Sequence, residues 1–303
     1  MNRFGSKLQT HWDWRAAGNF MFGGTGCGLI LMSAAASYPN PLPLALGLQA
    51  LALIGLGLFL VWLEIGRPWR ALHVFFHPQT SWMTREGSVG TILMPLALAG
   101  LFMEIPGLVA LSGILGLVYL FCQGRILLAS KGIPSWREPA IVPLILSTGL
   151  SEGSGLLILT LYAIDMAPIQ GWVFFSFIAF LAFRAYAWST YLGKLNGSKA
   201  PKNTLSILNG INPLMLWGAN VTPIVLLLAS MFLSSYTGLL SCLGALLAVA
   251  GGWYMKFIIV ARASQVQGYS LGKLQKGRPK MKAPVRRKPD NFVFDQKYEK
   301  ENN

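Results

Sequence analysis

Apolar residues fill this chain in long runs that are separated by short polar turns. The run "LPLALGLQALALIGLGLFLVWL" shows no alternation of polar and apolar positions. A helix crosses a bilayer with about 20 apolar residues, whereas the strands of a membrane barrel alternate over shorter segments. The pattern predicts eight spanning helices, near residues 16–37, 42–64, 87–105, 106–129, 140–163, 169–192, 211–234 and 238–261.

The predicted fold is therefore an all-α integral membrane protein with eight transmembrane helices, which we expect in two four-helix bundles. Residues 1–132 would contain the first bundle and residues 133–262 the second, followed by a basic tail over residues 263–303. The start "MNRFGSKLQTHWDWR" leads directly into a run of spanning length. It lacks the short apolar core of a cleavable signal, so we expect the first helix to be retained.

Composition and charge agree with a membrane protein and predict its orientation. The chain is 53% hydrophobic and 12% charged, against roughly one quarter charged in an average soluble domain. Its 25 Lys and Arg gather on one side, since the opposite turns "YPNPLP", "EIPG", "IDMAPIQG" and "SSYTG" contain none. The positive-inside rule then predicts a multi-pass protein of a prokaryotic cytoplasmic (inner) membrane with both termini in the cytoplasm. Docking of an acidic partner is a rival cause of the same asymmetry.

The tail "KLQKGRPKMKAPVRRKPDNFVFDQKYEKENN" is rich in Lys, Arg and Pro. It has too few apolar residues to fold alone, so we expect it to lie solvated near anionic lipid headgroups. Ordering against a partner subunit is the alternative. No nucleic-acid fold is indicated, and we expect no nucleic-acid partner.

Metal and haem sites are not expected in this chain. Iron–sulfur and zinc sites need clustered ligands, whereas the cysteines are isolated on different predicted helices: Cys27, Cys122 and Cys242. The histidines all lie outside the predicted spans, so no helix pair offers two imidazoles to a haem: His11, His73 and His77. The glycines of "GGTGCG" lie within the first helix, where they favour close helix packing rather than nucleotide binding.

Polar residues within the spans are costly in hydrocarbon and are functional candidates by default. They are Asn19, Glu64, Glu86, Tyr119, Gln123, Glu152, Arg184 and Asn220. Glu64 ends the second helix and Glu86 begins the third, so both carboxylates return to one membrane boundary. The connector between them carries Arg67, Arg70 and Arg85 with aromatic residues that favour the headgroup region.

A carboxylate pair at that boundary suits a molecule with an apolar tail and a redox-active polar head, and a quinone fits this description. Reduction of a quinone takes up protons as well as electrons, and a partly buried glutamate is able to relay protons. The alternative is that Glu64 and Glu86 simply pair with the neighbouring arginines.

Three stretches resemble one known family. "EIGRPWRA" at the end of helix two, "SWMTRE" before helix three and "GIPSWREP" before helix five are similar to the DmsC/NrfD membrane anchors of molybdopterin oxidoreductases, which include the polysulfide reductase anchor. The resemblance implies an anchor that exchanges electrons between membrane quinone, menaquinone or ubiquinone, and a ferredoxin-like iron–sulfur subunit. That subunit connects to a molybdopterin catalytic subunit with molybdenum or tungsten.

The resemblance also implies the site residues. Glu86 matches a family glutamate at the quinol site, and Glu64 stands where dimethyl sulfoxide reductase anchors have a histidine. Asn19, Tyr119, Gln123 and Arg125 are the implied polar contacts from helices one and four, and Arg67 flanks the carboxylates. The start "WDWRAAGNFMFGGTG" is further similar to the anchors of phenylacetyl-CoA:acceptor oxidoreductases, which implies anaerobic oxidation of a cytoplasmic CoA thioester with quinone as acceptor.

Two polar residues lie deeper in the predicted second bundle. Glu152 is about 12 residues from either end of its helix, so we expect a neutral, hydrogen-bonded acid that packs helices; a stepping stone for protons is the alternative. Arg184 is about eight residues from the cytoplasmic end, and snorkelling to the interface is favoured over an inward orientation.

Two other classes of protein compete with the anchor. A secondary transporter is the main alternative, because glycines around a buried acid, as in "STGLSEGSGLL", are common in carriers. An enzyme with its own active site is disfavoured, since no catalytic set of residues is evident and the chain is expected to be non-catalytic by itself.

Overall fold

The fold is given by a computed structural model, which describes residues 6–65, 68–165 and 170–266. The candidate residue Arg67 and residues 267–303 of the expected tail lie outside this range. The helices run α1 (Trp14–Gly18), α2 (Gly24–Ser37), α3 (Leu44–Glu64), α4 (Trp82–Phe102), α5 (Pro106–Ala129), α6 (Ile141–Ala163), α7 (Gly171–Asn196), α8 (Lys202–Pro213), α9 (Thr222–Phe232) and α10 (Thr237–Phe257).

Three π-helical turns continue these helices without a break: η1 (Asn19–Gly23), η3 (Leu214–Val221) and η5 (Ile258–Arg262). η1 joins α1 to α2, and η3 joins α8 to α9, so that each pair forms one long helix. Two 3₁₀ turns, η2 (Pro68–Phe75) and η4 (Ser234–Tyr236), lie in connections. The described chain thus forms eight long helical segments.

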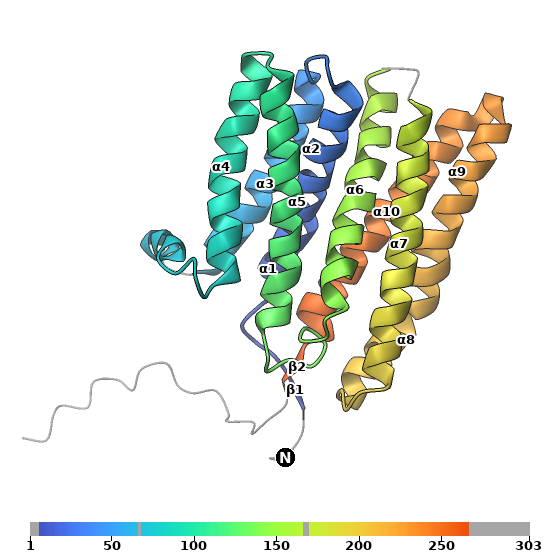
Figure 1. Cartoon of the computed structure of the whole chain (residues 1–303). Coiled ribbons are helices and arrows are strands. Elements are labelled where there is room, and N and C mark those ends of the chain that lie inside the picture. The colour runs from blue at the N-terminus through green and yellow to red at the C-terminus, as the bar shows by residue number, and fades with distance from the viewer. Residues whose placement is uncertain (1–5, 66–67, 166–169, 267–303) are drawn as a thin grey trace, which may run out of the picture.

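The all-α membrane fold is confirmed. In the described residues, seven helical segments have the length and hydropathy to cross a membrane, and the eighth, α4, is a 21-residue helix with Arg85 and Glu86 near its start. Figure 1 shows α2 to α5 on one side of the molecule and α6 to α10 on the other. The chain is a multi-pass protein of the lipid bilayer.

Three helices extend beyond their predicted bounds by a turn or more. α4 begins at Trp82, where the Ser81 hydroxyl accepts a hydrogen bond from the Thr84 amide (3.3 Å) and caps the helix, so Glu86 lies in the second turn. α7 continues to Asn196, and α8 begins at Lys202. The apolar pattern missed these turns because their residues are polar where the helices leave the hydrocarbon.

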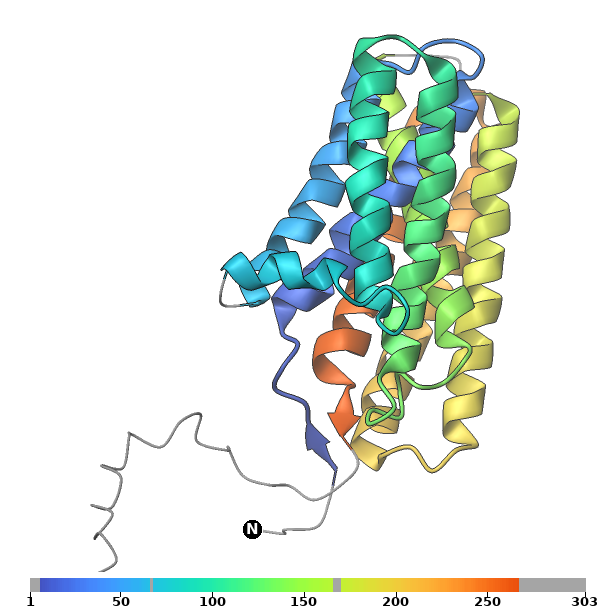
Figure 2. The same cartoon turned by 60° about the vertical axis from the view of Figure 1, so that its left-hand side comes forward.

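One end of the molecule collects the basic connections. α1, α4, α6 and α8 begin there and α3, α5, α7 and η5 finish there, so we name it the basic end (Figure 1). Here β1 (Lys7–Leu8) and β2 (Gln265–Val266) form a short antiparallel pair that joins the two ends of the described chain. Figure 2 shows η2 lying across this end beside α4, as expected for a connector at the membrane surface.

The buried core consists of two apolar clusters at different depths, and both include residues from the two helix groups. Towards the basic end, one cluster includes Phe20, Ile145, Trp188 and Met255. Towards the opposite end, the other includes Leu29, Leu157, Phe177 and Ala248. Between them lies a band of buried polar side chains, which we name the polar layer: Asn19, Thr25, Glu86, Gln123, Glu152, Arg184, Asn220 and Lys256.

Candidate functional site

Glu86 belongs to a buried cluster of hydrogen-bonded side chains in the first helix group. Asn19 Nδ2 donates to Glu86 Oε1 (3.0 Å), and the Tyr119 hydroxyl donates to Asn19 Oδ1 (3.2 Å). Gln123 Nε2 donates to the Asn19 carbonyl (3.0 Å). All four side chains are buried. The structure therefore brings together four of the residues expected from the sequence, and we name them the Glu86 cluster.

The backbone of η1 makes this cluster possible. π-Helical turns are frequent at functional sites, and here the Asn19 carbonyl at the start of η1 accepts a hydrogen bond from the Gln123 side chain. A Cβ atom at Gly23 would lie 3.1 Å from Asn19 Oδ1 and 3.4 Å from the Tyr119 hydroxyl. The glycine thus lets the polar side chains of α5 approach η1 closely.

Two adjoining pockets share Asn19 and Glu86 in their linings. A pocket of about 250 Å³ at the basic end also contacts His11, Trp12 and Glu64. A second pocket of about 360 Å³ lies between α3 and α4 and is lined mainly by apolar side chains such as Phe59, Trp62 and Phe75. The pocket at the basic end therefore adds a histidine and a second glutamate to the shared polar residues, whereas the pocket between α3 and α4 adds mainly apolar surface.

Glu64 lines the pocket at the basic end together with Glu86 and is only partly buried. Its Oε1 atom has no hydrogen-bond partner among the described residues. His11 lines the same pocket. Sequence reasoning missed His11 as a site residue because it precedes the first helix. The signal available was its position three residues before α1, on the side where Glu64 and Glu86 were expected.

The alternative interpretation, in which Glu64 and Glu86 pair with arginines, is not seen among the described residues. The ion pairs found there join other residues: Arg15 with Asp13 (2.9 Å), Lys194 with Glu138 (3.8 Å) and Lys256 with Glu152 (2.6 Å). The hydrogen bonds of Asp13 with Arg15 lower the pKa of this carboxyl below its ordinary value. Arg15 also donates to the Leu63 carbonyl (2.9 Å), which ties α1 to the end of α3.

Arg125 is not part of the Glu86 cluster. Its guanidinium lies over the Trp82 ring (4.6 Å to the centroid), and Arg85 lies over the same ring (4.1 Å). Arg85 donates to the carbonyls of Pro78 and Gln79, away from the pocket. The two arginines therefore stabilise the start of α4 through cation–π contacts and contribute only indirectly to the position of Glu86.

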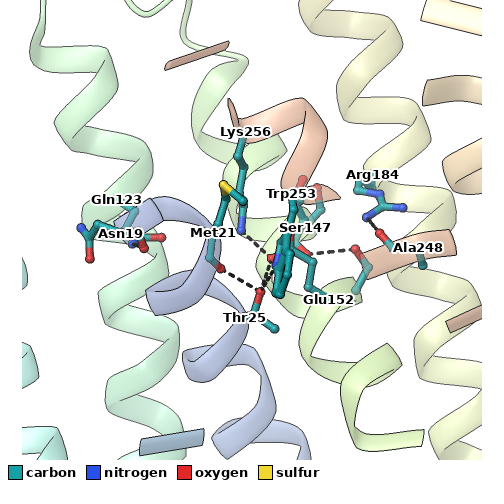
Figure 3. Close-up of polar contacts among 12 residues, drawn as sticks. Asn19, Met21, Thr25, Gln123, Ser147, Glu152, Arg184, Ala248, Trp253 and Lys256 are labelled. Carbon is teal, nitrogen blue, oxygen red and sulfur yellow. Dashed lines mark hydrogen bonds and ion pairs between the residues drawn. The ribbon is translucent and has the colours of Figure 1, made fainter. Parts of the chain in front are cut away.

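Glu152 forms a buried ion pair that the sequence reasoning did not predict. Lys256 Nζ lies 2.6 Å from Glu152 Oε2, and both side chains are fully buried. The same carboxylate oxygen lies 2.8 Å from the Thr25 hydroxyl, which accepts from Trp253 Nε1 (2.8 Å). Figure 3 shows this group between helix one and α10. The sequence predicts that Glu152 is a neutral, hydrogen-bonded acid; the structure instead gives it Lys256 as an ion-pair partner.

Lys256 was overlooked because it lies near the end of the last predicted helix, where a lysine usually reaches water. Five apolar or small residues follow it before Arg262, which places Lys256 about 9 Å inside that end. Its burial follows from Glu152, since a carboxylate in the middle of α6 is the nearest compensating charge.

Arg184 turns inward, so the expected snorkelling is wrong. It donates to Asn220 Oδ1 (2.7 Å), to the Ala248 carbonyl (2.9 Å) and to the Ala219 carbonyl. Because α7 continues to Asn196, Arg184 is about 12 residues, roughly 18 Å, from the basic end. That distance exceeds the reach of the side chain, and the π-helical turn η3 supplies acceptors instead.

The glycines around Glu152 have a packing function. α6 is a continuous helix from Ile141 to Ala163, rather than a helix broken at the buried acid. A Cβ atom at Gly153 would overlap the backbone of Gly28, and one at Gly149 would overlap Leu120. The glycines bring α2 and α6 into close contact, as small residues do in membrane helices. The feature that suggested a transporter therefore has a structural explanation.

Metal ligands are not grouped in the described part of the chain: no three His, Cys, Asp or Glu side chains come together there. Cys27 and Cys122 are buried, and Cys242 is partly buried. All three are free thiols on different helices.

Comparison with known proteins gives no match, either to a family model or to a curated protein. The likeness to DmsC/NrfD anchors in "EIGRPWRA" and "SWMTRE" is thus carried by short stretches of sequence. A function has to be argued from the geometry of the Glu86 cluster and its two pockets.

Proposed function

We propose that this chain is the quinone-reactive membrane anchor of a multi-subunit molybdenum or tungsten/iron–sulfur oxidoreductase. One observation carries the proposal: a buried glutamate, hydrogen-bonded to an asparagine, lines both a pocket at the basic end that also contains His11 and Glu64 and an apolar pocket between α3 and α4. A quinone needs both, since its head is polar and its isoprenoid tail is apolar.

The residues present fit a quinone. Its carbonyl oxygens need hydrogen-bond donors, and Asn19, which lines both pockets, carries an amide N–H₂ group that Tyr119 helps to orient. Its isoprenoid tail needs apolar surface that opens towards lipid, and Phe59, Trp62 and Phe75 line the second pocket. Phe59, Phe75 and Trp62 are partly exposed, so this pocket lies at the membrane-facing side of the helix group.

A bound quinone supplies the chemistry by taking up two electrons and two protons as it becomes a quinol. The protein's part is to hold the head and to move protons to and from it. Glu86 is buried and touches the pocket, and is therefore the residue that exchanges protons with the head. Glu64 lies at the rim with one unpartnered oxygen among the described residues, and links Glu86 to water at the basic end.

The electron source in this proposal is a ferredoxin-like iron–sulfur subunit that docks at the basic end. Two features support this position. Trp14 (59% exposed) and Trp69 (84% exposed) present aromatic surface there, and large aromatic residues are enriched in protein interfaces. The positive-inside rule places this end in the cytoplasm. A cytoplasmic CoA thioester such as phenylacetyl-CoA is then accessible to the catalytic partner.

Substitution of Glu86 by glutamine tests the proposal, because it keeps the size and hydrogen bonds of the side chain but removes its ionisable group. We expect quinone-linked turnover of the assembled complex in membranes to fall at least tenfold. Glu104→Gln is the matched control, since Glu104 is exposed at the opposite end. Full turnover in an assembled Glu86→Gln complex would show that Glu86 has only a structural role.

A further inference from the structure

Four residues with charged side chains are buried in the described part of the chain: Glu86, Glu152, Arg184 and Lys256. Two are acids and two are bases, so their charges cancel when all four are ionised. Only Glu152 and Lys256 are in direct contact. Arg184 and Glu86 are hydrogen-bonded to neutral groups, which leaves one positive and one negative charge without an ion-pair partner.

The four groups alternate in charge across the polar layer, in the order Glu86, Lys256, Glu152 and Arg184. Lys256 is paired with Glu152, and Gly252 separates Glu152 from Arg184: a Cβ atom at Gly252 would overlap Glu152 Oε1 and lie 3.0 Å from Arg184 Nη1. Figure 3 shows Gln123 and Asn19 on one side of Lys256 and Glu152, and Arg184 on the other.

Gly24 brings Lys256 close to the Glu86 cluster. A Cβ atom at Gly24 would lie 2.7 Å from Lys256 Nζ and 3.0 Å from Gln123 Oε1, so those two atoms are no more than about 6 Å apart. Gln123 Oε1 has no hydrogen-bond partner among the described residues. The Gln123 amide thus turns its oxygen towards the ammonium and its nitrogen towards Asn19, which in turn donates to Glu86.

We propose that Lys256 is the counter-charge of Glu86, acting across Gly24 and the Gln123 amide. Lys256, Glu152 and Arg184 together carry one excess positive charge, which stabilises an ionised Glu86 in a site that has low dielectric. The electrostatic link stands on the geometry alone; its consequence, that Lys256 sets the pH range in which Glu86 exchanges protons with a quinone, rests on the proposed function.

Other cations in the described residues are less well placed to balance Glu86. Arg85 and Arg125 lie over Trp82, and Arg15 is paired with Asp13. The titratable groups that face the Glu86 cluster or Lys256 from the surrounding helices are His11, Cys27, Glu64, Tyr119, Cys122 and Glu152 with Arg184. Of these, only Arg184 is a permanent cation, and Glu152 lies between it and Lys256.

Infrared titration of the full chain in lipid nanodiscs tests the link without any quinone. The C=O band of protonated Glu86 is assigned as the band lost in Glu86→Gln, and its pH dependence is compared in four proteins: wild type, Lys256→Met, Glu152→Gln and the double variant. The most direct comparison is Glu152→Gln with the double variant, because these differ only at Lys256 and contain no Glu152 that could take up a proton.

We expect Glu86 to titrate about one pH unit higher in the double variant than in Glu152→Gln, and higher in Lys256→Met than in wild type. A unit charge at about 10 Å has an effect of this size at an effective dielectric of about 20. The double variant retains a single excess positive charge and should titrate near wild type.

Equal titration of Glu152→Gln and the double variant would overturn the counter-charge role. If Lys256→Met does not fold, the comparison of Glu152→Gln with the double variant still tests whether Lys256 stabilises ionised Glu86. Failure of the proposed function is distinguishable, because quinone-linked turnover of the wild type would then be absent while the infrared shifts persist.

Discussion

Breaking the Glu152–Lys256 ion pair from one side should destabilise the protein much more than removing both partners. Glu152→Leu leaves the Lys256 ammonium in the core without its carboxylate and takes an acceptor from Thr25. Loss of one partner of a buried ion pair costs about 3–5 kcal/mol, whereas apolar replacement of both partners is often close to neutral.

The expected values follow from these contacts. We expect Glu152→Leu to lower the unfolding free energy by about 4 kcal/mol and to lower the Tm by roughly 10 °C for a chain of this size. Adding Lys256→Met to Glu152→Leu should recover about 2 kcal/mol, because no unpaired ammonium then remains. Met is chosen because it keeps the length of the lysine stem.

The double-mutant cycle compares wild type, Glu152→Leu, Lys256→Met and the variant with both changes. Their thermal unfolding in nanodiscs is followed by Trp fluorescence. Lys194→Met is the matched control, because Lys194 is exposed and lies 3.8 Å from Glu138, so its loss should cost less than about 1 kcal/mol. If the losses of the two single variants simply add in the double variant, the pair makes no coupled contribution and the reasoning is refuted.

Three further predictions concern packing, pH and orientation. Gly153→Ala should lower the Tm strongly and Gly132→Ala hardly at all. A Cβ atom at Gly153 would overlap the Gly28 backbone, whereas nothing lies within 4 Å of a Cβ atom at Gly132. Equal Tm values of the two variants would count against close packing of α2 on α6. The pKa of Asp13 is lowered in the folded protein, so its pair with Arg15 stabilises the fold above the ordinary pKa of about 4, and this contribution is lost as the pH falls through the lowered pKa. Wild type and Asp13→Asn should therefore differ slightly in Tm at pH 6 and have similar Tm values in acid. A Tm difference that grows in acid would contradict the sign of this effect. Reporter fusions after Lys199 should be cytoplasmic and fusions within residues 38–43 external, since the basic connections lie at one end. The reverse result would place Glu86 and its pockets near the outer side of the membrane.

The helices were predictable because their apolar runs have spanning length. Helix ends alone indicated that Glu64 and Glu86 return to one membrane boundary. The further grouping of Asn19, Tyr119 and Gln123 with Glu86 came from the resemblance to quinone anchors, because helix ends do not show which polar residues of different helices face one another.

Residues whose partners are distant in sequence could not be placed in this way. Lys256 and Glu152 are 104 positions apart, and nothing in either local pattern indicates that α10 faces α6 at that height. Arg184 was misjudged because its helix is longer than its apolar run, and Arg125 because a guanidinium near an acid also has an aromatic ring within reach. Tertiary packing, rather than periodicity, decides these orientations.

Photoaffinity labelling can show whether the two pockets beside Glu86 hold a quinone. A photoreactive quinone with an isoprenoid tail is cross-linked to the full chain in nanodiscs and the labelled peptides are mapped by mass spectrometry. The account predicts saturable labelling of peptides from α3 and α4 that line the apolar pocket, around Phe59 and Met83. It also predicts that unlabelled quinone competes and that Phe59→Arg reduces the labelling by blocking the tail. Labelling that is not saturable, or that concentrates on α7 and α9 instead, would contradict the claim.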